Sequence, residues 1–288
     1  MTLPALLVAN AHSRRGREIE PFVAALKHGG LALRREECRR REDLGALIRR
    51  LRHEVGSVIL GGGDGTMNAA AAALRDTGLP LGILPLGTAN DLARTLGIPD
   101  DAEAAAGVIL AGRTRRLDLG CVNGHPFFNV ASMGLSVDIT RRLTKLMKRR
   151  LGVFAYPVAA IAVIATAGRF HATLSTDGHD EKVRTMQIAV GNGRFYGGGM
   201  VVEEGAAIDD GLLDVYSLEP RARWRLLLMA REFRAGEHKH LDEVRTLRCR
   251  ALTVTTRRPR HVSADGEIVT ETPARFTVLP QAVVAFAP

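Results

Sequence analysis

The most constraining stretch of this sequence is residues 61–68, which read GGGDGTMN. The apolar residues 57–60 before it are typical of a short buried strand. The Ala-rich residues 67–75 after it are typical of a helix. A strand, a glycine loop and a helix start together predict a phosphate site, because backbone N–H groups and the positive end of the helix face the anion.

Asp64 narrows this prediction to a particular kind of ligand. The loop lacks the Lys-Ser/Thr pair that closes a Walker A motif. A carboxylate inside an anion loop would repel phosphate unless Mg²⁺ or a proton intervenes. A nucleotide carried with its metal therefore fits the loop better than bare phosphate, and a plain tight turn is the alternative interpretation.

The charge of the chain indicates an anionic partner. The net charge is +9 and the pI is near 10.2, which suits nucleic acid, a phosphate-rich substrate or a membrane surface. The chain has three tyrosines and one tryptophan, which argues against base-stacking platforms. We therefore expect no nucleic-acid partner.

Length and composition predict a soluble, cytoplasmic protein. A chain of 288 residues with 46% apolar content can bury a large core in one large or two modest domains. The three cysteines include no CxxC pair, which favours a reducing compartment. Residues 1–9 lack the basic region of an export signal. Residues 153–167 are apolar but short and contain Pro157, so a spanning helix is not expected.

The first part of the chain alternates strand and helix patterns. Besides the strand before the glycine loop, we expect strands at 5–9, 31–35 and 81–84. We expect helices at 17–28, 43–53, 67–75, 90–96 and 101–111. Repeated units of this kind predict a mostly parallel sheet whose ligands lie at the carboxyl ends of the strands.

Near residue 115 the pattern changes to short strands. Residues 117–122 and 127–131 flank Asn123-Gly124, a strong hairpin signal. Further strands are expected at 170–176, 185–190, 212–218, 247–255, 261–264 and 282–286. Helical patterns cover 141–167 and 221–235. This half of the chain is predicted to be a second, mainly antiparallel domain, and its last strand could pair with either domain.

Three more stretches carry groups suited to phosphate and metal chemistry. Residues 85–93, PLGTANDLA, again join a strand to a helix, where Thr88 or Asn90 could cap the helix or Thr88 could donate to a phosphate. Asp91 could orient water around a metal. Residues 208–214, IDDGLLD, offer carboxylates and loop carbonyls to a hard cation. Residues 263–267, SADGE, and the IDDGLLD stretch are each only a turn when taken alone.

Taken in order, the four stretches resemble the diacylglycerol kinase catalytic-domain family. That family includes soluble bacterial diacylglycerol kinases, sphingosine kinases and YegS/BmrU-type lipid kinases. The resemblance runs over nearly the whole chain, including Gly191-Asn192-Gly193. GGDGT alone is shared with NAD kinases and phosphofructokinases, whereas PLGTAND with a late DGE is more specific.

The resemblance implies an α/β fold with two domains. It implies an N-terminal Rossmann-like nucleotide domain at 1–122, with 276–288 as a candidate for completing it. Residues 123–275 are then a mainly antiparallel β-sandwich domain for the lipid substrate, and the active site lies in the cleft between the two domains.

The resemblance also implies ATP- and Mg²⁺-dependent phosphorylation of a lipid hydroxyl, on diacylglycerol or a related lipid such as phosphatidylglycerol or a sphingoid base. Glu267 matches the proton acceptor, with Asp265 beside it. Asp210, with the carbonyls of Ala207 and Leu212, matches a Mg²⁺ site. Asp118 matches one of the acidic positions of a metal–water network, together with Asp64, Asp91 and Asp265. The nucleotide-binding positions are Gly62, Gly63, Asp64, Gly65, Thr66, Met67, Asn68, Thr88 and Asp91.

The chemistry of a general base sets one further expectation. An isolated glutamate, with a pKa of ~4.3, is a weak base near neutral pH. Glu267 is therefore expected in a desolvated or acidic environment, which Asp265 could supply.

The sequence departs from the family pattern at three places. The usual Asn-Pro opening is Asn10-Ala11, and a threonine assigned to the nucleotide is replaced by Glu36, Glu37 or Cys38. A proline before the metal loop is replaced near Glu204-Gly205. These changes affect the expected adenine-side contacts most.

Basic clusters suggest a membrane partner. Arginines and lysines gather at 39–41, 141–150 and 257–260; such runs are usually solvated, but each residue near anionic lipid contributes about 1 kcal/mol. We expect peripheral contact with the anionic inner face of a membrane and leave a homodimer open. The alternative functions are a soluble-substrate kinase of NAD-kinase type and a non-catalytic nucleotide- or nucleic-acid-binding protein.

Overall fold

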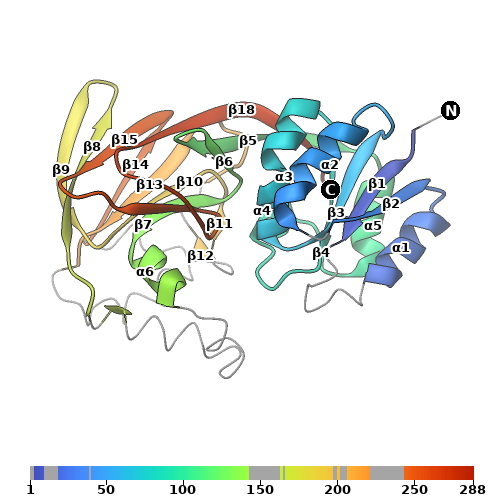
Figure 1. Cartoon of the computed structure of the whole chain (residues 1–288), viewed down its shortest axis with the longest axis horizontal. Helices are drawn as coiled ribbons and strands as arrows, with labels where there is room; N and C mark the ends of the chain where they lie inside the picture. The colour runs from blue at the N-terminus through green and yellow to red at the C-terminus, as the bar shows by residue number, and fades with distance from the viewer. Residues whose placement is uncertain are drawn as a thin grey trace.

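The computed structural model describes residues 3–9, 19–38, 40–142, 163–164, 166–196, 200–201, 206–220 and 243–288. Two lobes lie side by side along the longest axis, the N-terminal lobe with its helices on one side and the β-rich lobe on the other (Figure 1). The fold is mixed α/β, with a parallel sheet in the N-terminal lobe and a separate antiparallel sheet in the other, as predicted.

The N-terminal lobe is built on four parallel strands in the order β2-β1-β3-β4. They are β1 (Ala5–Ala9), β2 (Leu33–Glu37), β3 (Ser57–Gly62) and β4 (Leu81–Pro85). β3 and β4 are buried along their whole length, as continuous apolar strands of parallel sheets are. The order reverses between β1 and β3, and ligands of such sheets bind beyond the carboxyl ends of the strands at this reversal.

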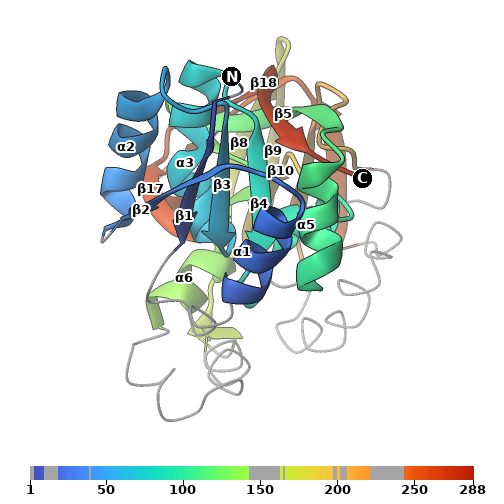
Figure 2. The same ribbon diagram turned by 90° about the vertical axis from the view of Figure 1, so that its right-hand side faces the viewer.

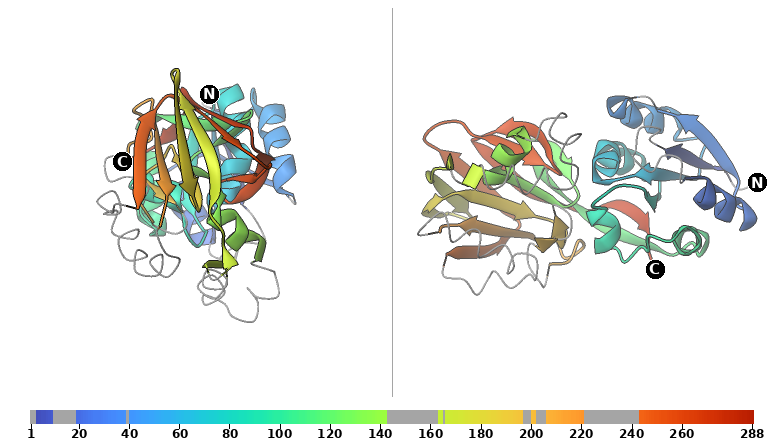
Figure 3. Two further views of the ribbon diagram at one scale, coloured as in Figure 1. Left: turned by 90° about the vertical axis from the view of Figure 1, so that its left-hand side faces the viewer. Right: turned by 90° about the horizontal axis from the view of Figure 1, so that it is seen from below.

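Helices cover both faces of this parallel sheet. α2 packs on α3, and α1 packs on α5 across the sheet from them (Figures 2 and 3). Their bounds are α1 (Ile19–His28), α2 (Leu44–Leu51), α3 (Asp64–Thr77), α4 (Asp91–Thr95) and α5 (Ala102–Leu110), and a 3-10 turn, η2 (Arg41–Asp43), precedes α2. On α2 the apolar Leu44, Ile48 and Leu51 are buried while the arginines between them are exposed, so one stripe faces the core.

The remaining strands of the described chain build the β-rich lobe. They are β5 (Thr114–Val122), β6 (His125–Phe127), β7 (Val130–Gly134), β8 (Phe170–Thr176), β9 (His179–Thr185), β10 (Gln187–Gly191), β11 (Phe195–Tyr196), β12 (Met200–Val201), β13 (Leu213–Leu218), β14 (Val244–Cys249), β15 (Ala251–Thr256), β16 (His261–Ala264), β17 (Glu267–Glu271) and β18 (Ala274–Phe286). Two of them, β5 and β18, also extend into the N-terminal lobe. One antiparallel sheet has the order β14-β13-β10-β7-β16-β17. An apolar core fills the space between it and β8, β15 and β18, and α6 (Leu135–Arg142) covers a smaller cluster.

β18 joins the two lobes through one continuous sheet. Its first half pairs with β15, and its second half lies beside β4, with Ala285 opposite Leu81. β5 runs antiparallel to it on both sides of a register shift between Leu279 and Val283. The larger sheet therefore extends from β2 at one end of the molecule to β9 at the other.

The strands differ from the prediction at several places: the predicted strand 127–131 is interrupted at Phe128 and Asn129, β18 begins at Ala274 rather than 282, and β9 and β17 were missed. Two differences have a clear physical reason. Residues 247–255 do not form one strand: β14 and β15 belong to different sheets, and Arg250 lies at the change. β9 was missed because its sequence, HDEKVRT, is mostly polar and exposed along one edge. Edge strands carry charged side chains of this kind, which hide the strand pattern.

Several sequence predictions lie outside the described residues. These are the helix at 221–235, most of the helical pattern at 141–167, and the departures at 10–11 and 204–205. Within the described part of the chain, no helix is both long and apolar enough to cross a membrane.

Candidate active site

The two glycine-bearing loops of the N-terminal lobe touch through their backbones. Gly63 ends the first loop at the start of α3, and Gly87 lies in the loop after β4. A methyl group on Gly63 would be 3.0 Å from Gly87 Cα, and one on Gly87 would overlap Gly63 Cα. Only glycines permit this approach, so the sequence brings both loops to one place at the sheet edge.

Asn90 holds the second loop closed. Its Oδ1 accepts from Gly87 N at 2.9 Å, and its Nδ2 lies 3.2 Å from Pro85 O. The residue is buried and has a positive φ of 52°, which asparagine adopts more readily than most residues. Asn90 occupies the N-cap position of α4, but its side chain makes no capping bond. Its side chain thus shapes the loop rather than capping the helix.

Asp64 connects both loops to the β-rich lobe. Its Oδ1 accepts from Leu92 N, in the first turn of α4, at 3.0 Å and lies 3.4 Å from Asn129 Nδ2. Asn129 lies between β6 and β7 in the other lobe. The carboxylate is therefore fixed at the point where three segments meet.

Asp265 anchors the DGE turn to the same segment. Its Oδ1 accepts from Asn129 N at 2.9 Å and Val130 N at 3.1 Å, and its Oδ2 accepts from Phe128 N at 2.8 Å. Burial raises the pKa of Asp265 to about 7, the three N–H donors lower it, and the Asp64 carboxylate adds to the rise. The carboxylate is directed at backbone amides, so Asp265 holds the turn in position in this structure.

Glu267 lies at the mouth of the nucleotide loop. Its Oε1 is 3.3 Å from Arg41 Nη1, and its side chain is 65% exposed. The same nitrogen lies 2.6 Å from where a Cβ on Gly65 would be, so Glu267 and the start of α3 are separated by one guanidinium group. The prediction that Glu267 lies in a desolvated or acidic environment was wrong. The side chain is largely exposed and lies beside the Arg41 cation, and the Asp265 carboxylate faces backbone amides instead of Glu267.

The other predicted nucleotide positions differ in what they expose. Met67 and Thr66 are buried, and their N–H groups bond to Gly63 O at 3.3 and 2.8 Å. Thr66 packs against Gly62, where any side chain would overlap it. Asn68 Oδ1 is buried without a partner among the described residues, but an acceptor atom does not bind phosphate. Thr88 is exposed on the second loop, and Asp91 is buried at the start of α4.

Two residues of this site were missed from the sequence. Asn129 lies in an apolar stretch, Phe127 to Val130, where a lone asparagine suggests a buried hydrogen-bonding role but no partner. Arg41 belongs to a run of three arginines, and nothing in the run distinguishes it from the others. Their partners are distant in sequence, so only the fold identifies them.

Family models match both halves of the chain. The model described as the diacylglycerol kinase catalytic domain matches residues 4–122, and the YegS C-terminal NAD kinase beta sandwich-like domain matches residues 129–287. The chain belongs to the diacylglycerol kinase family.

Individual relatives support the same family assignment, and a solved structure shares the fold. A "Probable lipid kinase YegS-like" of Pseudomonas aeruginosa (strain UCBPP-PA14) is 34% identical over 98% of this chain and 94% of its own length. A "Diacylglycerol kinase" of Mycobacterium tuberculosis (strain ATCC 25618 / H37Rv) is 35% identical over 81% of this chain and 77% of its own length. The fold matches a solved diacylglycerol kinase from Bacillus anthracis with a TM-score of 0.77 at 20% identity, over 99% of this chain and 97% of that one.

The predicted Mg²⁺ loop of this diacylglycerol kinase family member is closed by an arginine. Asp210 Oδ2 is paired with Arg248 Nη2, and its Oδ1 accepts from Leu212 N at 2.9 Å. The exposed Asp209 beside it binds Arg115 through two bonds of 2.6 Å. Both oxygens of Asp210 are engaged, so the donors at Ala207, Asp210 and Leu212 do not fit a Mg²⁺ ion in this arrangement.

Asp118 clamps this loop to β18. Its Oδ2 accepts from Gly211 N and its Oδ1 from Gln281 N, each at 2.7 Å. Asp118 is buried, and both oxygens are taken by backbone amides. Asp118 was predicted to belong to a metal–water network. In the structure its carboxylate instead accepts two backbone hydrogen bonds that hold the loop to β18.

Asp64 provides a better fit for a nucleotide-borne Mg²⁺. Only its Oδ1 has hydrogen-bond partners among the described residues, which leaves Oδ2 at the start of α3. Mg²⁺ is commonly held by one or two carboxylates together with substrate phosphates. No cluster of three or more metal-binding side chains occurs in the described ranges, so the phosphates would have to supply most of the ligands.

Two cavities lie near functional segments. One of about 410 Å³ lies beyond the end of β2 and is lined by Glu37, Cys38, Asp43, Ala46, Leu47 and Arg50. Ala9 on β1 pairs with Glu37 on β2 and with Gly61 on β3. Glu37, which lines the cavity, is therefore two strand spacings, ~9.6 Å, from Gly61 at the start of the glycine loop.

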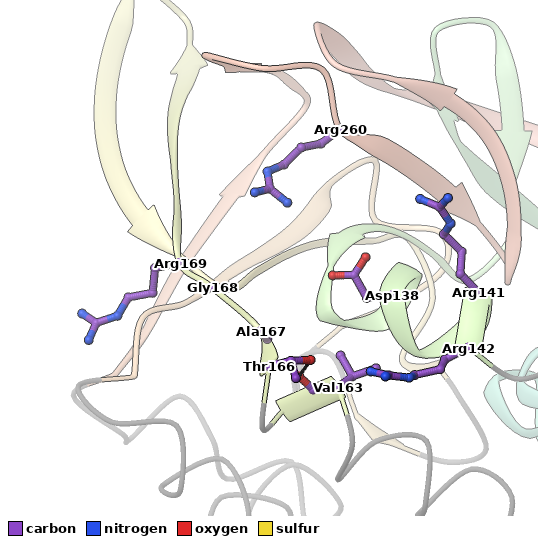
Figure 4. Close-up of a pocket in the computed structure, with 9 residues that line it drawn as sticks. All are labelled: Asp138, Arg141, Arg142, Val163, Thr166, Ala167, Gly168, Arg169 and Arg260. Atoms are coloured by element: carbon purple, nitrogen blue, oxygen red, sulfur yellow. Dashed lines mark hydrogen bonds between the residues drawn. The ribbon is translucent and has the colours of Figure 1, made fainter.

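The other cavity, of about 490 Å³, is lined by four arginines and one aspartate (Figure 4). Asp138, Arg141 and Arg142 come from α6, and Arg260 stacks on the Phe170 ring at 3.9 Å. Burial lowers the pKa of Arg260, and the Asp138 carboxylate raises it. This cavity brings together two of the basic clusters that are far apart in sequence.

Proposed function

We propose that the chain is an ATP- and Mg²⁺-dependent lipid kinase that phosphorylates the hydroxyl of diacylglycerol or a related lipid. The observation that carries this is the shared residue Asn129, whose Nδ2 lies against Asp64 while its N–H bonds to Asp265. This residue links the glycine loop to the DGE turn across the two lobes. The names of the relatives support a lipid acceptor.

The nucleotide would lie along the two touching loops. At the start of α3 the N–H groups of Thr66 and Met67 bond to Gly63 O, so the N–H groups of Asp64 and Gly65 are the ones that would face a phosphate. Thr88 is exposed on the neighbouring loop and could donate its hydroxyl to a phosphate. The cavity beyond β2 supplies space for the nucleoside, and Glu37 and Cys38 would replace the family's threonine there.

The transfer itself requires positioning and charge neutralisation more than covalent chemistry by the protein. Glu267 would take the proton of the acceptor hydroxyl as its oxygen bonds to the terminal phosphorus. The bond from that phosphorus to the leaving oxygen breaks, and ADP departs. Asp64 would hold the nucleotide's Mg²⁺, which neutralises phosphate charge. Asp265 would keep Glu267 in place through the backbone of residues 128–130.

A peripheral membrane contact completes this proposal. The acceptor lipid resides in a bilayer, so the enzyme must meet its surface. Arg141 and Arg142 at the end of α6 lie on the lobe assigned to the lipid, together with Arg169 and Arg260 (Figure 4). Basic residues near anionic lipid are attracted to it.

The proposed function is tested with purified protein and labelled ATP. The acceptors are dispersed diacylglycerol, phosphatidylglycerol, a sphingoid base and, for the NAD-kinase alternative, NAD. We expect phosphate on a lipid and none on NAD. Transfer to NAD alone, or no ATP turnover with any acceptor, would refute the proposal.

Glu267→Gln is the matching variant. It removes the proton acceptor while keeping the shape of the side chain, so kcat should fall by at least ~10²-fold with ATP binding retained. Asp76→Asn, which alters an exposed carboxylate paired with Arg49 at the far end of α3, is the control and should keep full turnover. Unchanged turnover in Glu267→Gln would remove Glu267 from the mechanism.

A further inference from the structure

Arg41 occupies the space between the nucleotide loop and Glu267. It lies in η2, between β2 and α2, and reaches across to the β-rich lobe. Its Nη1 is 3.3 Å from Glu267 Oε1 and 2.6 Å from where a Cβ on Gly65 would be. A guanidinium group therefore lies against the helix start where a phosphate would bind.

The contact between Arg41 and Glu267 is weak enough to exchange. Both side chains are at least half exposed, at 50% and 65%, and exposed ion pairs contribute about 0–1 kcal/mol. The contact is also single, whereas arginine binds phosphate through two parallel bonds that are stronger. A triphosphate on the loop would thus compete successfully for the guanidinium.

We propose that Arg41 is a phosphate-binding residue that exchanges Glu267 for the terminal phosphate of the nucleotide. Without nucleotide it holds the Glu267 carboxylate. With nucleotide it binds the phosphate, and Glu267 becomes available to the acceptor hydroxyl. This proposal rests on the proposed function of the same site. In this proposal Arg41 both recognises the triphosphate and releases the Glu267 carboxylate, which acts as the general base.

The geometry favours the terminal phosphate over the inner ones. Arg41 Nη1 touches the residue proposed to face the acceptor hydroxyl, and the acceptor attacks only the terminal phosphorus. The exchange therefore predicts discrimination between ATP and ADP. It also predicts that removing the competing carboxylate strengthens ATP binding.

The first test measures nucleotide binding by calorimetry without lipid. Arg41→Gln should weaken binding of ATP by ~10-fold or more, the value of a charge-assisted hydrogen bond, and weaken ADP binding much less. Arg41→Lys keeps the charge but loses the paired geometry, so it should recover part of the loss. Arg49→Gln is the matched control, because Arg49 makes a similar exposed pair with Asp76 at the far end of α3.

The second test is a double-mutant cycle. Glu267→Gln should tighten ATP binding in the wild-type background and have no effect in the Arg41→Gln background. Three results would each overturn the proposal. Arg41→Gln could weaken the binding of ATP and of ADP equally, or weaken ATP binding no more than Arg49→Gln does. Glu267→Gln could also change ATP binding equally with and without Arg41. A wild-type chain that binds no ATP would refute the proposed function as well, whereas ATP binding unaffected by Arg41→Gln would refute only the role of Arg41.

Discussion

Gly87 shows how much one missing side chain determines. A methyl group added to it would lie 2.4 Å from Gly63 Cα and 2.6 Å from Asn90 Oδ1. The atoms in the way are backbone and a buried side chain, which cannot move cheaply. The contact between the two loops, and with it the phosphate site, therefore depends on both residues being glycine.

We predict that Gly87→Ala separates the two loops. Overpacking of this kind costs ~1–3 kcal/mol, and nucleotide affinity should fall with it, as measured by urea unfolding and ATP titration. Gly107→Ala is the control, since Gly107 in α5 has open space around it and alanine there should stabilise by ~0.5–1 kcal/mol. Equal behaviour of the two variants would contradict the contact.

The raised pKa of Asp265 makes stability depend on pH. In the folded chain the Asp265 carboxyl keeps its proton up to about pH 7, whereas an aspartate in the unfolded chain releases its proton near pH ~3.9. The contribution of Asp265 is therefore complete below that lower value and is lost as pH rises through about 7, with a slope of at most ~1.4 kcal/mol per pH unit.

Asp265→Asn should remove this dependence. The free energy of unfolding of the wild type, minus that of the variant, is expected to fall as pH rises across this window, measured in urea. A difference that rises with pH would mean that the three amide donors outweigh burial.

The sequence indicated these residues unevenly. Gly63, Asp64, Gly87 and Asn90 belong to motifs whose chemistry is local, so their place in the site followed from the chain order. Arg41 and Asn129 act through side-chain partners that are far away in sequence and lie in the other lobe, Glu267 and Asp64. Side-chain partners across two lobes are fixed by tertiary packing, which no periodicity encodes.

At the scale of elements, the loop of residues 206–212 is held by strand β5. Asp118 on that strand bonds to Gly211 N in the loop and Gln281 N in β18. The carboxylate thereby ties a turn to the place where β18 changes register. Both amides would lose their acceptor if this side chain were removed.

Asp118→Ala should cost up to ~2–6 kcal/mol, because two part-buried amide donors lose their acceptor at ~1–3 kcal/mol each. Asp118→Asn keeps one acceptor and should cost about half as much. Asp209→Ala, which breaks an exposed pair with Arg115, should cost under ~1 kcal/mol. Urea unfolding that ranks Asp118→Ala with Asp209→Ala would disprove the clamp.

Elements were predictable where the apolar pattern is continuous and bounded by turn residues. The bounds of β1 and β16 match the predicted 5–9 and 261–264, and Asn123-Gly124 does form the hairpin turn with two positive φ angles. The break at Arg250 was not predictable, because β14 and β15 are both strands by local pattern. Their different partners arise only when two sheets close over one core.

At the scale of the whole molecule, arginines from distant segments gather on the lobe assigned to the lipid. Arg141 and Arg142 on α6 and Arg260 before β16 share one cavity. The net charge of +9 is thus concentrated in part where a bilayer would be approached.

Reversing Arg141 and Arg142 to glutamate should weaken binding to vesicles containing phosphatidylglycerol by at least ~10-fold, given about 1 kcal/mol for each lost basic residue. Flotation with neutral phosphatidylcholine vesicles should show no change. Arg49→Glu on α2 together with Arg52→Glu just after it, in the other lobe, keeps the same net charge and should bind like the wild type. Equal flotation of both double variants would exclude this face as the contact.

β18 has a consequence for how the protein is made. It is synthesised after the whole β-rich lobe, yet it covers β4 and pairs with β5. Until it emerges from the ribosome, β4 exposes an unpaired edge, which in a nascent chain is a template for aggregation. The N-terminal lobe is therefore translated first but completes its sheet only when β18 has been synthesised. Slower translation would prolong the time for which the β4 edge is exposed, so it should not improve folding of this lobe.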